Sequence, residues 1–204
     1  LNLAKIKINL GIKMCIDVLR NPAKALATAK SRKNMGRTWL VLVEASVLFG
    51  LAVGLFVVRT ANFGAAAAQL ALVSAFSIFI LVLILSVILA YVLKLTVVTL
   101  GGTGRYFEGL TAVSYALLPI SASLFVAAIF ALAPAGIAIS ALATAVGFAY
   151  GLSILYRAVK ELFRTDMITA FTAVTILIVA LFVAASVTTG FAALTRLSTV
   201  VPLA

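Results

Sequence analysis

Five long apolar segments constrain the fold of this chain more than any other feature. They cover about residues 39–58, 69–93, 110–133, 136–156 and 167–194. A helix needs roughly 20 apolar residues to cross a hydrocarbon core about 30 Å thick, because each residue adds about 1.5 Å. The sequence therefore predicts an all-α, polytopic membrane protein with a bundle of five transmembrane helices.

The composition agrees with a membrane environment. Of the 204 residues, 65% are hydrophobic and only 10% are charged, with a mean hydropathy of +1.27. A soluble domain carries about 25% charged residues. The net charge of +11 would suit nucleic acid, but nine of the sixteen basic residues fall in residues 1–37. This placement favours a segment on anionic lipid beside a membrane domain of residues 38–200, and no nucleic-acid partner is expected.

The basic segment, residues 1–37, divides into two parts. Residues 1–20 mix apolar residues with lysines, which is typical of an amphipathic segment at the membrane surface. A second helix begins at "NPAKALATAK", with Asn21 as its cap and Pro22 at its first position, and we expect Gly36 to follow its end.

The distribution of basic residues predicts the orientation. With a cytoplasmic N-terminus, fourteen of the sixteen basic residues lie inside, and only Arg59 and Arg196 lie outside. This is the pattern of the positive-inside rule, so we expect the N-terminus inside and the C-terminus outside.

Two GxxxG pairs predict close helix contacts. They are Gly50 with Gly54 in the first span and Gly147 with Gly151 in the fourth. Small residues let helix backbones approach each other in lipid, where little hydrophobic force holds helices together. The pairs fit packing within one chain, which we favour, and they also fit a homo-oligomer.

Polar and helix-bending residues inside the spans have two interpretations each. Pro119 lies in the third span and predicts a kink, because its ring clashes with the carbonyl of Tyr115. The kink can simply shape the helix, or it can open a cavity. Threonines 169, 172 and 175 form a stripe that either holds helices together, as we favour, or lines a path for a polar solute.

Glu44 is the one acidic residue clearly inside a span. A carboxylate in lipid is costly and usually has a partner or a function. Lys94, Arg105 and Arg157 are expected on the same side of the membrane and are candidate partners. A structural ion pair and a functional site fit Glu44 equally well.

The sequence offers no set of residues for catalysis or metal binding. It has no histidine and one cysteine, Cys15, and it lacks paired carboxylates within the spans. Without a nucleophile–base pair or a histidine-ligated metal site, we expect no enzyme activity, no metal and no cofactor.

The stretch "GGTGRYFEG" connects the second and third spans. Its glycines follow a helix and match neither phosphate-loop pattern. Gly101 and Gly102 are therefore expected to end the second span. Arg105 should hold the turn inside, Tyr106 should anchor at the interface, and Glu108 should begin the third span.

The order of these features resembles the Yip family of membrane proteins, named for interacting with Ypt/Rab-type small GTPases. The resemblance covers about residues 16–190 and rests on three stretches: "VLRNPAKAL", "LGGTGRYFEGLTAVSYALLP" and "YGLSILYRAVKELF". It implies a five-span protein with a cytoplasmic N-terminus, linked in eukaryotes to vesicle trafficking. It carries over no GTPase-binding site, because the N-terminal segment is short. The high alanine content favours a prokaryotic cytoplasmic membrane.

Two classes of function remain. The first is a non-catalytic scaffold or adaptor that binds a protein partner on its cytoplasmic face. The basic segment and the lack of a catalytic set support it. The second is a small channel or transporter, suggested by Glu44, Pro119 and the threonine stripe. We favour the scaffold, because five spans show no convincing internal repeat of the transporter kind.

Overall fold

The structure, a computed structural model, describes residues 16, 18–32, 34–60 and 65–200. The expected surface segment of residues 1–20 lies mostly outside these described residues. The helices, in chain order, are α2 (Pro22–Arg32), α3 (Met35–Thr60), α4 (Ala65–Thr99), α5 (Tyr106–Ala131), α6 (Ile137–Leu162) and α7 (Met167–Val200). A short 3₁₀ turn, η1 (Pro134–Gly136), separates α5 from α6.

The prediction of an all-α, polytopic membrane bundle is confirmed. Within the described residues, α3, α4, α5 and α6 are long and apolar enough to cross a membrane, and Met167–Val183 of α7 forms a shorter apolar helix. The helices extend beyond the expected spans. For example, α4 continues past Lys94 to Thr99, because hydropathy marks the apolar part of a helix and not its polar ends.

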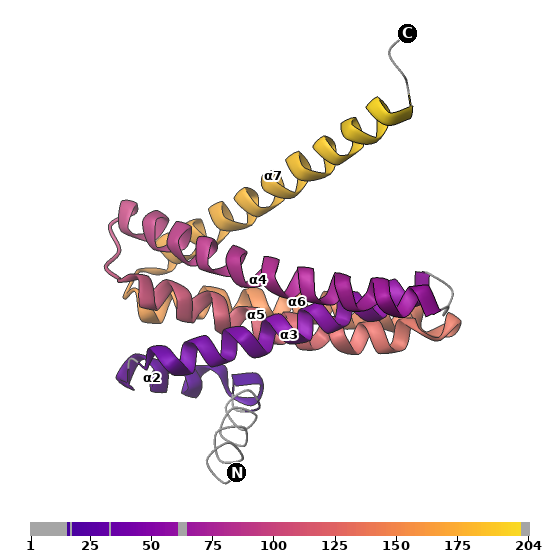
Figure 1. The fold of residues 1–204 in the computed structure, drawn as a ribbon. Coiled ribbons are helices and arrows are strands. Elements are labelled where there is room, and N and C mark those ends of the chain that lie inside the picture. The colour runs from indigo at the N-terminus through magenta and orange to yellow at the C-terminus, as the bar shows by residue number, and fades with distance from the viewer. Residues whose placement is uncertain (1–15, 17, 33, 61–64, 201–204) are drawn as a thin grey trace.

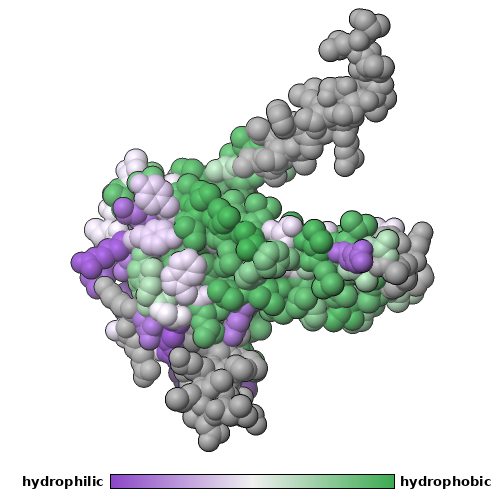
Figure 2. All heavy atoms as spheres, viewed as in Figure 1, coloured by the Kyte–Doolittle hydropathy of each residue, from purple (hydrophilic) through white to green (hydrophobic). Residues whose placement is uncertain are grey.

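The helix α5 lies at the centre of the bundle. Figure 1 shows α3, α4, α5 and α6 running side by side, with α7 starting beside them and then pointing away. Half of the membrane-crossing part of α5 is buried, against 11% of that of α4. The outer helices therefore present apolar surface to lipid. In Figure 2, hydrophobic residues cover most of the bundle.

Both GxxxG pairs face a neighbouring helix of the same chain. Gly50 and Gly54 lie against α4, where a Cβ on Gly50 would come within 2.5 Å of the carbonyl oxygen of Ala75. Gly147 and Gly151 lie against α5, and a Cβ on Gly151 would come within 2.8 Å of the Ala116 carbonyl oxygen. These glycine faces therefore pack within the chain, and a homo-oligomer stays a prediction.

Several buried hydroxyl groups have partners, although among the described residues the buried hydroxyls of Tyr156 and Thr165 have none. Ser46, Ser114 and Ser121 each donate to the carbonyl oxygen four residues earlier, at 2.6–2.8 Å. Thr38 of α3 and Thr111 of α5 lie 3.1 Å apart between their hydroxyl oxygens. Thr111 donates its proton to the Phe107 carbonyl oxygen, so Thr38 is the donor between the two helices. An unpaired hydroxyl in lipid would be costly, and these bonds avoid that cost.

Candidate functional site

The polar side chains gather at one end of the bundle, which we call the basic end. It consists of residues 18–20, α2, the first turn of α3, residues 100–105 between α4 and α5, the end of α6 from Arg157 onward, and residues 163–166 between α6 and α7. Figure 2 shows most of the hydrophilic residues of that view there, with a smaller group at the opposite end. Its exposed basic residues are Arg20, Lys24, Lys30, Arg105, Arg157, Lys160 and Arg164.

The connection between α4 and α5 is a tight turn. The amide of Gly102 donates to the carbonyl oxygen of Val97 at 2.9 Å, and Gly101 has a φ of +87°. This left-handed conformation suits glycine, which has no Cβ to clash. At the other side of the turn, the amide of Arg105 donates to the Glu108 carboxylate at 2.9 Å. The buried Glu108 thus stabilises the start of α5.

This turn packs on the next connection at the basic end. The amide of Thr103 donates to the carbonyl oxygen of Phe163 at 3.3 Å. The Phe163 ring is fully buried, and it occupies the space that a Cβ on Gly104 would need. Phe163 was not expected from the sequence. The sequence feature closest to an indication of this contact is Gly104. This glycine has no left-handed φ; it is required because the Phe163 ring leaves no room for a side chain there.

Asp166 caps α7, which is typical of an aspartate directly before an apolar helix. Its carboxylate oxygens accept hydrogen bonds from the amides of Ile168, at 3.2 Å, and Thr169, at 3.4 Å. The hydrogen bond from the Thr169 side chain and these amide bonds lower the pKa of Asp166, because they favour its charged form.

The helix α2 is fixed to the bundle. The ammonium group of Lys30 donates to the backbone carbonyl oxygen of Glu161 at 2.6 Å. The hydroxyl of Tyr150 donates to the backbone carbonyl oxygen of Leu19, just before α2, at 2.9 Å. Val18 and Leu26 are fully buried. Residues 18–32 therefore contact the bundle, and the membrane-surface role expected of residues 1–20 stays a prediction.

The helix caps around α2 agree only in part with the sequence prediction. The cap at Asn21 is confirmed, since its side-chain oxygen accepts from the amide of Lys24 at 3.2 Å. Gly36 does lie beyond α2, which ends at Arg32, but it does not terminate that helix, because it lies in the first turn of α3. The side chain of Asn34 accepts from the amide of Arg37 at 3.3 Å and caps α3 instead.

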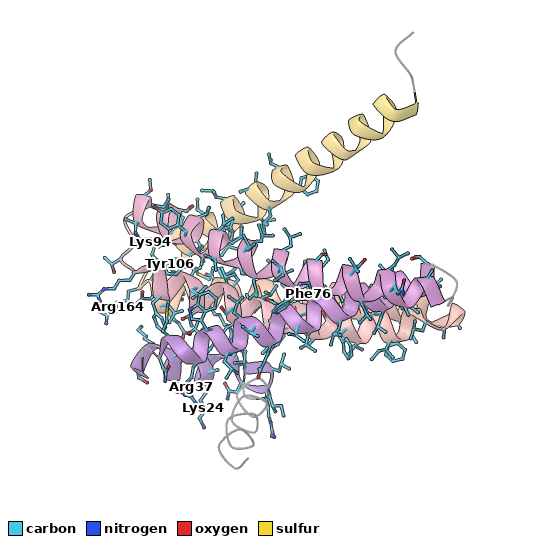
Figure 3. All side chains as sticks on the ribbon, viewed as in Figure 1. Lys24, Arg37, Phe76, Lys94, Tyr106 and Arg164 are labelled. Carbon is cyan, nitrogen blue, oxygen red and sulfur yellow. The ribbon has the colours of Figure 1, made fainter. Side chains whose placement is uncertain are left out.

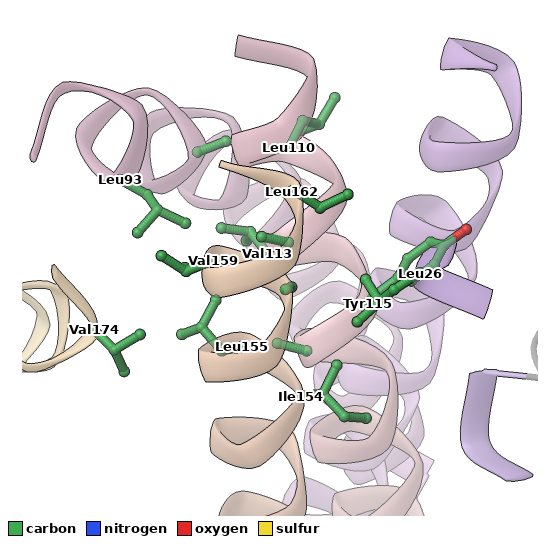
Figure 4. Packing of buried hydrophobic residues seen from close by; sticks show 14 of the residues in the cluster. Leu26, Leu93, Leu110, Val113, Tyr115, Ile154, Leu155, Val159, Leu162 and Val174 are labelled. Atoms are coloured by element: carbon green, nitrogen blue, oxygen red, sulfur yellow. The ribbon is translucent and has the colours of Figure 1, made fainter. Parts of the chain in front are cut away.

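A cavity lies between α2, α3 and α5. Its volume is about 380 Å³, and Arg37 of α3 and Tyr115 of α5 line it from the bundle side. The polar lining residues on the other side are Arg20, Asn21, Lys24 and Thr28. Figure 3 shows Lys24 and Arg37 close together at the basic end. Tyr115 is 3% exposed, and in Figure 4 its ring reaches from α5 toward α2 beside Leu26.

The structure brings some predicted site residues together. The ammonium group of Lys94 lies 5.8 Å from the centre of the Tyr91 ring, and the start of α5 packs beside Lys94 at Gly109. Tyr106 is half-buried there and packs against the apolar core, and Figure 3 shows it near Lys94. These two residues, with Arg105 and Glu108, form one cluster at the connection between α4 and α5.

The other predicted site residues lie on different helices. Arg157 is exposed on α6, and Glu44 is half-buried on α3. The ion pairs expected of Glu44 with Lys94, Arg105 or Arg157 stay a prediction.

Comparison with known proteins gives one match. The family model of the Yip1 domain matches residues 16–188. No curated protein and no solved structure matches the chain.

Proposed function

This chain belongs to the Yip1 domain family, and on that premise we propose that it is a membrane scaffold that binds a protein partner at its basic end. The family consists of integral membrane proteins and is known as non-enzymatic. The fold is that of a multi-pass membrane protein. The partner would present an acidic surface, because the basic end exposes guanidinium and ammonium groups.

One observation carries this proposal: the basic end is a built surface. Crossing the membrane requires only short turns, yet here two connections pack on each other through Phe163. A third element, α2, is held to α6 by Lys30, and residue Leu19 just before it is held to α6 by Tyr150. A surface that is fixed in this way can bind a partner without first becoming ordered, which lowers the entropy cost of association.

The proposed orientation places the basic end in the cytoplasm of a prokaryotic cell. The connections of the bundle alternate between its two ends, so basic residues from residues 20–37, 94–105 and 157–164 meet at one end. The positive-inside rule assigns such an end to the cytoplasm.

The packing between the helices supports a channel or transporter less than it supports a scaffold. Leu42 of α3 and Ala112 and Leu118 of α5 are at most 1% exposed and fill the space between the central helices. The buried serines donate to their own helices and so act as packing residues. A solute path would need hydrated polar groups along this line.

The proposal can be tested by purifying the tagged chain from native membranes and identifying bound proteins by mass spectrometry. The double variant Arg105→Gln, Arg157→Gln should lose most of a recurrent partner, because both charges are exposed at the basic end. The control Arg59→Gln, at the end of α3 far from the basic end, should retain it. Recovery of the monomer without a recurrent partner would contradict the proposal.

A further inference from the structure

The cavity between α2, α3 and α5 has the size and position of a ligand site. Its volume of about 380 Å³ lies within the usual range of small-ligand pockets, about 300–1,000 Å³. It lies at the basic end, and its floor reaches Tyr115. That residue is nine positions into α5, so about 14 Å along the helix axis. The cavity therefore extends from the polar end of the bundle to the third turn of α5.

The charge of the lining selects an anion. Arg20, Lys24 and Arg37 contribute three positive groups from two helices, and none of the lining residues that the structure describes is acidic. Positive groups gathered around one recess repel one another, and an anion between them removes that repulsion. Arginine adds paired N–H donors that match the oxygens of a phosphate, and lysine adds a point charge.

The neutral lining groups also favour a ligand rich in acceptor oxygens. The carbonyl oxygen of Asn21 is engaged by the amide of Lys24, so the group that Asn21 can offer a ligand is its NH₂ donor. The cavity also borders the first turn of α2, where the helix dipole favours negative charge. Tyr115 adds a hydroxyl from the opposite wall.

We infer that this cavity binds a phosphate group, with Arg20, Lys24 and Arg37 as its cationic ligands and Tyr115 at its floor. Basic pockets beside transmembrane helices on the cytoplasmic side are where anionic lipid headgroups bind. The phosphate belongs either to such a headgroup or to a soluble phosphate ester. Because α2 forms one wall and is also part of the proposed docking surface, a bound phosphate would join α2 to α3 and α5.

Binding can be measured on the full chain in neutral detergent by native mass spectrometry. The probes are a short-chain phosphatidylglycerol, a short-chain phosphatidylcholine and inorganic phosphate. We expect one phosphatidylglycerol to bind with at least about tenfold preference over phosphatidylcholine, since its net negative charge is not cancelled by a choline. The double variant Lys24→Gln, Arg37→Gln should lower that affinity at least about tenfold.

A matched control separates the cavity from general surface charge. Lys160→Gln removes an exposed charge at the same end, outside the lining residues, and should change the affinity less than about twofold. Tyr115→Phe keeps the ring and removes only the hydroxyl, so a loss of affinity with an unchanged melting temperature would support the site even if the double variant fails to fold. Equal losses in Lys160→Gln and the double variant would overturn the inference, as would equal binding of the two lipids.

Competition identifies the source of the phosphate. If inorganic phosphate displaces phosphatidylglycerol at millimolar concentration, the site takes a soluble phosphate ester. If phosphatidylglycerol stays bound while still requiring Lys24 and Arg37, the site takes a lipid headgroup. Neither result depends on a protein partner, so the cavity can fail while the scaffold proposal stands.

Discussion

Among the connections that the structure describes, those at the two ends of the bundle are built differently. At the far end, α5 and α6 are joined by the single 3₁₀ turn Pro134–Gly136, and Gly136 packs on the backbone of Phe130. At the basic end, the connection at residues 100–105 packs on Phe163, and α2 is fixed to α6. Returning a chain to the membrane requires only the first kind of connection. The additional packing at the basic end indicates that this end serves a further purpose.

The largest expected difference between the ends comes from their phenylalanines. Phe163 is fully buried at the basic end, whereas Phe130 is 43% exposed at the far end. Phe163→Ala should lower the free energy of unfolding by about 3 kcal/mol, because it leaves a cavity under both connections. Phe130→Ala should lower it by about 0.5 kcal/mol. Thermal unfolding in detergent, followed by circular dichroism, checks both values, and equal losses would remove the contrast.

The glycines of the residue 100–105 turn sharpen the comparison. Gly104→Val should destabilise the protein by about 2 kcal/mol, because the added side chain meets the buried Phe163 ring. Gly101→Ala should cost about 1 kcal/mol, since only its φ of +87° opposes a side chain and no atom lies within 4 Å. The same unfolding assay applies. A neutral Gly104→Val would show that the two connections are not packed together.

A smaller effect is expected from the hydrogen bond between α3 and α5 near the basic end. Thr111→Val removes the acceptor of the Thr38 hydroxyl and should cost about 0.6 kcal/mol, the typical value for such bonds in membranes. Thr144→Val on α6 removes a bond only within its own helix and should cost less. A double-mutant cycle with Thr38→Val measures the coupling, which should vanish if the hydroxyls do not interact.

The smallest effect concerns pH. Because the pKa of Asp166 is lowered in the folded state, its contribution is fully present above its unfolded pKa and is lost as pH falls through its folded pKa. Asp166→Asn should therefore flatten the acid side of the curve of melting temperature against pH. The sequence has no acidic residue between 109 and 160, so no carboxylate of the α5–α6 turn can produce this slope. An unchanged slope in the variant would contradict the assignment.

The features that the sequence predicted correctly depend on residues that are close together along the chain. The spans follow from runs of apolar residues, and the caps at Asn21 and Asp166 follow from a side chain beside the helix it caps. Gly36 does not end α2, although glycine is common at helix ends, because Asn34 already begins α3 there.

Contacts between distant residues could not be predicted from one sequence. Thr103 and Phe163 lie 60 residues apart, and Lys30 and Glu161 lie 131 apart. The cavity likewise combines Lys24, Arg37 and Tyr115 from three helices. The apolar pattern of a helix shows that it lies in the membrane. It does not show which neighbouring helix it packs against or at what height, so it cannot show which side chains meet.

Site-specific photocrosslinking in native membranes tests the central claim most directly. A photoreactive residue would replace either Ala27 on α2 at the basic end or Ala135 in the far turn, since both alanines are exposed. We predict a recurrent adduct of one mass at position 27 that disappears in the Arg105→Gln, Arg157→Gln background, and none at position 135. Equal labelling at both positions, or no recurrent adduct at position 27, would contradict the basic end as the docking surface.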